Sequence, residues 1–397
     1  MEQSFISSTK QGVIMSKSAE AWVLKAGDPR KPGPGNLVRE KIHVNAIEAN
    51  EVLVAPIFGC WEANMSHALK RQPIDVCRFR NEPQVVLGNA GVVRIVEIGR
   101  DIKNLQPDQL AIVSPNGMVD RWGYTVRALG YDSPGRSGIL ATLVVLTEMQ
   151  LVPIPESTKY SLAQWAGFSA RYVTAWSNWQ LAYAVFRLLV PHEDFPNPNV
   201  WGWGGGTTLA EIDLARRQGC IAAMLSGNAA NLERIRRSAI IPVDRRPFSA
   251  LHWDEERYQV ESKYRREYKR AEELFLAEVE RITQGDMVQI FVDYIGSPVY
   301  RATLKALSRE GVITTAGWKG GMKLSHSRAE ECISRHQHIH THYAKYSQAV
   351  EAVKYAESTG WLPEPPQRIC KFEDIPELAE RYSRNQTDYF PCFEINA

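Results

Sequence analysis

The sequence has few cysteines, and they are not spaced as metal ligands or as disulfide partners. Six occur in 397 residues, and no two form a C-x-x-C pair: Cys60, Cys77, Cys220, Cys332, Cys370 and Cys392. Zinc knuckles and small disulfide-bonded scaffolds need closely spaced cysteines, so the spacing argues against both. Scattered, reduced thiols are typical of a cytosolic enzyme, and we expect a cytoplasmic protein.

Long apolar runs and an excess of one charge are also missing. No apolar stretch reaches the roughly 18 residues of a membrane span. The first residues lack the basic segment and apolar core of a signal peptide, and we expect residues 1–17 to form a loose tail. A formal net charge of +2 gives no reason to expect nucleic acid or an anionic membrane surface as a partner.

The sequence does contain enough apolar residues for two domains, at roughly 150 residues each. Residues 20–115 and 142–155 hold short runs of strand-forming residues separated by Gly, Pro, Asn and Asp, which predict a partly open β-barrel. From Ser161 onward, a long apolar segment without further glycine after Gly167 predicts a helix.

The second half alternates between strand and helix patterns. Residues 197–226 have the order strand, glycine turn, helix, strand, which is a βαβ unit. Further buried strands are predicted at 286–296 and 311–318, separated by a helix that ends at Gly311. Residues 261–283 repeat apolar residues every three or four positions and predict a one-sided helix with a charged outer face. This alternation predicts a parallel sheet and an α/β fold.

Glycines fill the predicted turn between the first strand and helix of the βαβ unit. Gly202, Gly204, Gly205 and Gly206 precede Thr207. Glycine allows a tight turn and lets the backbone approach a pyrophosphate, while the helix N-terminus offers N–H groups to phosphate. The turn therefore favours dinucleotide binding. Thr208 replaces the third glycine of the fingerprint, which leaves the strength of cofactor binding open.

The end of the second strand indicates which dinucleotide would bind. Ser226, Gly227 and Asn228 follow the strand, without the acidic residue that holds the ribose 2′-hydroxyl of NAD. A carboxylate there would repel a 2′-phosphate, so its absence favours NADP(H). Candidate phosphate contacts are Ser226, Asn228 and Arg245, although Arg245 could equally be a solvated turn arginine.

From about Glu51 to the C-terminus, the order of these blocks resembles the medium-chain dehydrogenase/reductase superfamily. Residues 85–113 resemble its strand pair and turn, with Pro107-Asp108-Gln109 in place of Gly-Asp. The resemblance implies a GroES-like catalytic domain at 18–170 and 345–397 and a Rossmann dinucleotide-binding domain at 171–344. It adds three residues to the cofactor site: Gly296, Ala316 and Gly317.

One branch, the crotonyl-CoA carboxylase/reductases, is more similar than the others. "LGYDSPGRSG" resembles its Gly-Tyr/Phe-Glu motif, the helix at 261–283 resembles its insertion, and "THYAKYSQA" resembles its Ser-His-Phe-Ala segment. Zinc-dependent relatives have a first-loop Cys and a Gly-His-Glu sequence. Here Trp61 and Gly88-Asn89-Ala90 stand in those places, and the four-cysteine zinc lobe is missing. The resemblance therefore implies a member without a metal.

Histidines alternate at positions 336, 338, 340 and 342, so on a strand their side chains would share one face. Zinc needs about three protein ligands, and no carboxylate or cysteine is obviously paired with this ladder, so we expect exposed or interfacial histidines. The resemblance places His338–His342 on the last strand of the cofactor domain and gives His342 the position of the active-site histidine.

The resemblance also maps the carbon dioxide site of the carboxylating branch onto this chain. The Asn of that site corresponds to Trp61, the aromatic–Glu pair to Tyr131-Asp132, and the His to His342. Trp61 has one indole N–H, no amide, and more bulk, which should weaken carbon dioxide capture. We therefore expect simple reduction, with His342 donating a proton, directly or through a water that Asp132 holds.

The leading interpretation is an NADPH-dependent reductase of an activated double bond in an α,β-unsaturated acyl thioester, carried by coenzyme A or a carrier protein. The alternatives are a reductase of quinones, small enones or ketones, a carboxylating enoyl-thioester reductase, and a degenerate non-catalytic scaffold. Thr208 and Ala230-Asn231, where the branch usually has Lys-Arg, favour the scaffold. A homodimer or tetramer is expected through edge strands at residues 312–318 and 339–344.

Overall fold

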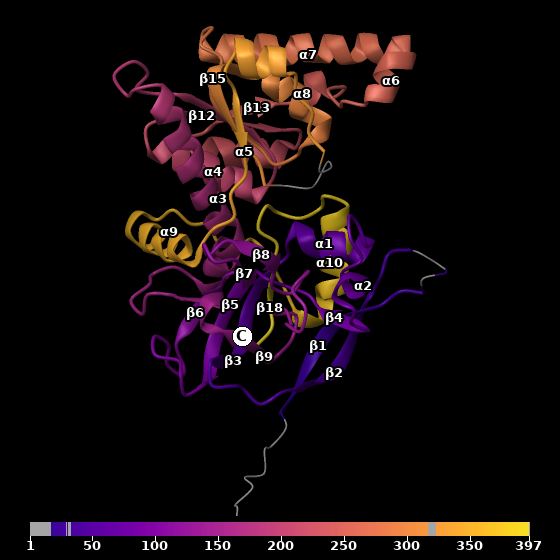
Figure 1. Ribbon diagram of the computed structural model, residues 1–397, viewed down its shortest axis with the longest axis vertical. Helices are drawn as coiled ribbons and strands as arrows, with labels where there is room; N and C mark the ends of the chain where they lie inside the picture. Colours follow the sequence, from indigo (N-terminus) through magenta and orange to yellow (C-terminus); the bar gives the residue numbers. More distant parts are fainter. Residues whose placement is uncertain (1–16, 29, 31–32, 317–322, 397) are drawn as a thin grey trace, which may run out of the picture.

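The computed structural model describes residues 17–28, 30, 33–316 and 323–396. Two parts lie one above the other along the long axis, with α3 (Leu162–Leu189) between them (Figure 1). The fold class is confirmed as α/β, with a parallel sheet in one part and antiparallel sheets in the other. Lys17, expected to end the tail, is instead the first residue of β1.

The first part is built mainly from antiparallel strands. A seven-stranded sheet has the order β10-β6-β5-β3-β18-β17, with β9 paired to β3, and a three-stranded sheet has the order β2-β1-β4. β7 and β8 form a separate hairpin. The strands are β1 (Lys17–Lys25), β2 (Leu37–Val44), β3 (Glu51–Cys60), β4 (Gln84–Val86), β5 (Gly91–Ile98), β6 (Leu110–Val113), β7 (Asn116–Val119), β8 (Thr125–Ala128), β9 (Val144–Thr147), β10 (Leu151–Pro153), β17 (Ile369–Cys370) and β18 (Cys392–Glu394). The C-terminal strand β18 pairs with β3, so the end of the chain returns to this first part.

The second part is a six-stranded sheet in which all paired strands are parallel. Its order, β13-β12-β11-β14-β15-β16, is the 3-2-1-4-5-6 order of a Rossmann sheet. The order reverses between β11 and β14, and ligands of such sheets bind beyond the carboxyl ends of the strands at this point. The strands are β11 (Asn199–Trp203), β12 (Ile221–Ser226), β13 (Ile241–Asp244), β14 (Val288–Asp293), β15 (Leu307–Thr314) and β16 (His338–His340).

Helices cover both sheets, and α3 is the longest of them in the described residues. Ser161 caps α3: its hydroxyl oxygen accepts a hydrogen bond from the Gln164 N–H, and the Gln164 side-chain oxygen accepts one from the Ser161 N–H. The α3 helix continues without interruption past residue 170, where the first segment of the GroES-like domain is expected to end. The other helices are α1 (Ala63–Lys70), α2 (Val76–Arg80), α4 (Gly206–Arg217), α5 (Ala229–Arg237), α6 (Glu255–Val260), α7 (Ser262–Thr283), α8 (Ser297–Ala306), α9 (Tyr346–Thr359), α10 (Ile375–Ser383) and a π-helical segment at Arg328–Ser334.

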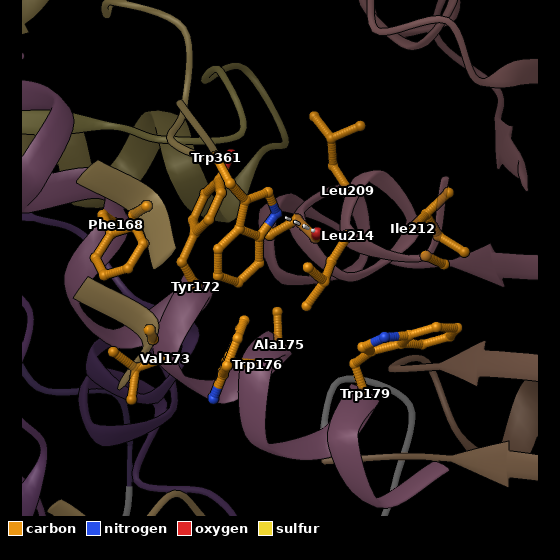
Figure 2. Packing of buried hydrophobic residues seen from close by; sticks show 14 of the residues in the cluster. Phe168, Tyr172, Val173, Ala175, Trp176, Trp179, Leu209, Ile212, Leu214 and Trp361 are labelled. Carbon is orange, nitrogen blue, oxygen red and sulfur yellow. Dashed lines mark hydrogen bonds between the residues drawn. The ribbon is translucent and has the colours of Figure 1, made fainter. Parts of the chain in front are cut away.

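One apolar core joins the two parts. Aromatic residues of α3, among them Tyr172 and Trp176, pack with Trp361 and with leucines of α4 (Figure 2). The Trp361 indole N–H donates to Ala210 O in α4 at 3.0 Å. Residues of the barrel sheet and of the parallel sheet belong to the same buried cluster. The packing therefore holds the glycine turn before α4 against the first part of the protein.

Two expectations about the parallel sheet were wrong in detail. The helix α8 ends at Ala306 rather than at Gly311, because the next residue, fully buried Leu307, already pairs with Val288 of β14. A register shift between Val288 and Ile290 makes room for residues 308–311 in β15. Glu310 has a φ of 59° in this bulge. β15 lies between β14 and β16, so it is not an edge strand, whereas β16 is.

Candidate cofactor and proton-donor site

The glycine turn holds Thr208 closely against the end of β11. A Cβ added to Gly202 would lie 2.7 Å from Thr208 Cγ2, and one added to Gly204 would overlap Thr208 Oγ1. The hydroxyl of fully buried Thr208 donates to Trp203 O at 3.4 Å. Thr208 thus occupies the space that the missing side chains of two glycines leave, and this keeps α4 close to the strand.

Gly205 and Gly206 face different surroundings at the N-terminus of α4. A Cβ added to Gly205, the N-cap residue, would meet no atom within 4 Å. A Cβ on Gly206 would lie 2.7 Å from Tyr389 O and 3.0 Å from Arg171 Cδ. The turn is therefore open on the Gly205 side, where free N–H groups and the helix dipole would hold a pyrophosphate, and closed on the Gly206 side.

Ser226 and Arg245 meet beyond the end of β12. The backbone N–H of Arg245 donates to the backbone oxygen of Ser226 at 3.1 Å. The Arg245 side chain lies beside Gly227, where an added Cβ would be 3.2 Å from Arg245 Nε. In the described part of the chain no carboxylate pairs with Arg245, whereas its neighbour Arg246 binds Asp244. A guanidinium without an ionic partner beside a strand-end serine fits the 2′-phosphate of NADP.

The other predicted cofactor residues are placed as follows. Asn228 caps α5 and accepts from the N–H groups of Ala230 and Asn231 at 2.9 and 3.2 Å, so its side chain already serves the helix. Thr207 is the second residue of α4. Ala316 is half-buried against the joint core, and Gly317 lies outside the described residues.

Asp293 shapes the turn after β14, where Gly296 has a φ of 87°. Its carboxylate accepts from the Gly296 and Ile295 N–H groups at 2.9 and 3.0 Å and from Thr303 Oγ1 at 2.9 Å. Burial raises the pKa of Asp293 to about 6, against the effect of these hydrogen bonds. Asp293 was not among the predicted site residues, although an aspartate at the end of a buried strand could have indicated it.

Asn178 of α3 fixes the segment that carries His342. Its amide oxygen accepts from the His342 N–H at 3.1 Å and from Thr314 Oγ1 at 3.1 Å, and its Nδ2 donates to His342 O at 2.9 Å. Asn178 is fully buried. Asn178 therefore holds both the N–H and the C=O of His342, which follows β16, and no pattern in the sequence indicates this contact.

The His342 ring lies edge-on to Tyr124 of the β7–β8 hairpin, with ring centroids 5.1 Å apart. Lys345 Nζ lies 4.3 Å from the centroid of the same tyrosine ring. Burial, together with the positive charge of Lys345, lowers the pKa of His342. Burial, with additional effects of His338 and His342, lowers the pKa of His340 to about 4. His342 is half-buried at the junction of the two parts, and its protonated form is disfavoured there.

Of the other predicted catalytic residues, Trp61 and Tyr131 lie in the apolar core of the first part, and Asp132 is partly buried. Trp61 is fully buried, and its indole N–H donates to Ser66 Oγ at 2.9 Å. Asp132 accepts from the Ala128 N–H at 2.6 Å and from Arg127 at 3.5 Å. Tyr131 is buried in the same cluster as Trp61, and burial and Asp132 raise the pKa of its hydroxyl. None of the hydrogen bonds found for Trp61 and Asp132 within the described residues reaches His342.

A buried polar cluster lies directly behind the glycine turn. Arg171 of α3 donates to Cys60 Sγ at 2.9 Å and to Trp61 O at 2.7 Å, and Glu62 lies 3.4 Å from its Nε. Burial raises the pKa of Glu62 to about 7, and the charge of Arg171 opposes the shift. Desolvation disfavours the charge on Arg171, but Cys60, Glu62 and neighbouring groups outweigh it and raise the pKa of Arg171. This cluster was not predicted, because its members come from segments far apart in the sequence.

Within the ranges that the structure covers, no group of three or more His, Cys, Asp and Glu side chains is arranged to hold a metal ion. The described helices also include none that is both long and apolar enough to cross a membrane.

Comparison with solved structures identifies the arrangement. The crotonyl-CoA carboxylase/reductase AntE in complex with NADP superposes with a TM-score of 0.79 at 19% identity, over 96% of this chain and 95% of that one. The chain has the fold of the medium-chain dehydrogenase/reductases. The 2-octenoyl-CoA carboxylase reductase CinF, in complex with NADP and 2-octenoyl-CoA, gives 0.76 at 17% identity over 96% and 88% of the two chains.

A putative alcohol dehydrogenase from Sinorhizobium meliloti 1021 has the same fold, with a TM-score of 0.71 at 17% identity over 96% of this chain and 100% of that one. No protein-family model and no curated protein sequence matches the chain. The resemblance stated from the sequence, including the presence of carboxylase/reductases among the relatives, is confirmed at the level of the fold.

Proposed function

We infer that this protein is a cytoplasmic NADPH-dependent reductase of an activated carbon–carbon double bond. The observation that carries the proposal is the open face of Gly205, at the point where the strand order reverses, together with Arg245 beside Ser226. Two structural relatives contain NADP in their solved complexes. When bound, the nicotinamide would supply a hydride to the β-carbon of the substrate.

The residues of this chain would have separate roles. The α4 N-terminus at Gly205 would hold the pyrophosphate, and Ser226 with Arg245 would hold the 2′-phosphate. His342 would give a proton to the α-carbon once an enolate has formed, and Tyr124 and Asn178 would keep the His342 ring and backbone in position. Trp61 and Gly88-Asn89-Ala90 supply no zinc ligands, so the enolate would be stabilised by hydrogen-bond donors.

The substrate class we propose is an α,β-unsaturated acyl thioester, reduced without carboxylation. CinF was solved with 2-octenoyl-CoA, which supports a thioester substrate. Trp61 argues against carboxylation, because its only polar hydrogen is bonded to Ser66 and its ring is fully buried. A homodimer formed through the edge strand β16 completes the proposal.

A substrate panel tests this function directly. NADPH oxidation is measured with enoyl-CoA thioesters and with free enones, quinones and ketones, in the presence and absence of labelled bicarbonate. We expect turnover with the thioesters and no label in the product. Label incorporated at the rate of NADPH oxidation would refute reduction without carboxylation, and faster turnover of free enones or quinones would refute the substrate class. A chain that binds no NADPH, as judged by quenching of tryptophan fluorescence, would be a scaffold.

A further inference from the structure

Cys60 and Cys392 face each other across two neighbouring antiparallel strands, β3 and β18. The Trp61 N–H donates to Pro391 O at 2.9 Å, while the Cys60 N–H points the other way, to Ala90 O. The two cysteines therefore form a non-hydrogen-bonded pair, for which Cα atoms are about 4.5 Å apart and side chains are closest. That spacing lies within the range of about 4.4–6.8 Å that a disulfide bridges.

The two thiols also emerge on the same face of the sheet. Both belong to the joint core beneath α3, and the Cys392 thiol donates to Ala163 O of that helix at 3.5 Å. Cys370, on the next strand, pairs with Phe393 and lies in the barrel core on the opposite face. Of these three buried cysteines, only Cys60 and Cys392 are placed to react with each other.

Arg171 distinguishes the two sulfurs. Its guanidinium donates to Cys60 Sγ at 2.9 Å, and a neighbouring cation is a recurring feature of reactive cysteines. The interaction with Cys60 and burial instead raise the pKa of Cys392, which keeps it a thiol. Cys60 is thus suited to attack an oxidant first, and Cys392 to resolve the product.

We propose that Cys60 and Cys392 form an oxidisable dithiol, which hydrogen peroxide converts to a disulfide that links β3 to β18. The Cys60 sulfur attacks one peroxide oxygen, so that an S–O bond forms, the O–O bond breaks and one water leaves, giving a sulfenic acid. The Cys392 sulfur then attacks the Cys60 sulfur, and the S–O bond breaks. The second water leaves with the proton of Cys392, and two electrons have passed to the peroxide. Peroxide is little larger than water and reaches the pair through local opening of the strands.

The disulfide acts on the glycine turn through Arg171. Its formation removes the thiol that Arg171 contacts, and the Arg171 Cδ methylene packs against Gly206. A shift of this side chain changes the closed side of the turn, so oxidation lowers the affinity for NADPH. This consequence rests on the proposed function, whereas the disulfide itself does not.

The test uses the full-length protein with Cys332→Ser, which removes the exposed thiol. After peroxide treatment, we expect the intact mass to fall by about 2 Da, and dithiothreitol should reverse this change. The remaining thiols are then alkylated. Peptide mapping should find Cys60 joined to Cys392. Cys392→Ala should abolish the change, and Cys370→Ala should leave it intact. Alkylation of both Cys60 and Cys392 in the treated protein, or a link between other cysteines, would overturn the proposal.

NADPH titration of the reduced and oxidised forms tests the coupling. We expect the dissociation constant to rise about tenfold or more on oxidation. Equal dissociation constants would overturn the coupling to the glycine turn. If neither form binds NADPH while the disulfide still forms, the failure belongs to the proposed function and the dithiol stands.

Discussion

Replacing Gly205 or Gly206 by alanine should separate dinucleotide binding from folding. The two residues are adjacent in the turn, yet a Cβ on Gly205 meets nothing within 4 Å, while one on Gly206 meets Tyr389 O at 2.7 Å and Arg171 Cδ at 3.0 Å. The first substitution fills the space in which a pyrophosphate would lie. The second forces the C-terminal segment or the buried arginine to move.

The expected magnitudes follow from these distances. Overpacking of a well-packed site costs about 1–3 kcal/mol. Gly206 is the first residue of α4, where alanine regains part of a helix preference of about 1 kcal/mol, so Gly206→Ala should lose roughly 1–2 kcal/mol of stability. Gly205→Ala should stay within about 0.5 kcal/mol of the wild type. Its dissociation constant for NADPH should rise about 100-fold, or about 2.7 kcal/mol, because a Cβ prevents the close approach of phosphate.

Two measurements on each variant decide the matter. Urea unfolding followed by tryptophan fluorescence gives the free energy of unfolding, and NADPH titration gives the dissociation constant. Each variant serves as the other's control, and Gly205→Val should abolish measurable binding. If folded Gly205→Ala binds NADPH as tightly as the wild type, the pyrophosphate does not lie against Gly205, and the assigned cofactor site is wrong.

Four further predictions follow. NADPH should bind more tightly than NADH, and Arg245→Ala should weaken only NADPH binding, about tenfold or more. Substitution of Arg246, which is ion-paired with Asp244, controls for the loss of surface charge. Equal losses of affinity for both nucleotides would contradict this prediction. His342→Ala should slow turnover about 10²-fold, and the wild-type rate should fall as pH rises, with a midpoint below the usual 6.5, because the donor must be protonated; a rate independent of pH would exclude this role. Burial raises the pKa of Glu211 to about 8, although a hydrogen bond from Tyr294 opposes the shift. Between pH 4.5 and 8 the folded state therefore holds a proton that the unfolded state has lost, and the free energy of unfolding should fall as the pH rises. In urea unfolding, Glu211→Gln should remove this slope, which is at most about 1.4 kcal/mol per pH unit. Light scattering should give at least twice the chain mass of 44.8 kDa, and a monomer at micromolar concentration would refute pairing through β16.

The elements that could be predicted from the sequence are those whose signals are local. Ser161 and Gln164 form a capping box, and the start of α3 was placed there. The apolar spacing of residues 261–283 gave α7 almost to the residue. The end of α8 was misplaced, because the bulge at Glu310 depends on the pairing of β15 with β14 and not on its own residues.

The contacts of the site were less accessible to sequence reasoning. Arg171, Glu62 and Cys392 meet behind the glycine turn although long stretches of chain separate them. Asn178 reaches His342 across a similarly long separation. Such pairs are brought together by the packing of α3 between the two parts, and a single sequence carries no pattern at that distance.

Thr208 bears on the choice between an enzyme and a scaffold. From the sequence, Thr208 in place of the third fingerprint glycine left the strength of cofactor binding open. In the structure, Gly202 and Gly204 leave the room that Thr208 occupies, and its hydroxyl is hydrogen-bonded to Trp203 O. The substitution therefore gives no reason to expect a damaged turn.

The second argument for a scaffold was the lack of a basic pair at Ala230-Asn231. In the structure these residues lie in the first turn of α5 and donate their N–H groups to Asn228, which caps the helix. Arg245, which follows β13, brings a positive charge to the same strand ends from the neighbouring strand, beside Ser226. The charge that a 2′-phosphate needs is thus present, supplied from a different element. Both features that favoured a scaffold in the sequence are compatible with a working cofactor site once the chain is folded.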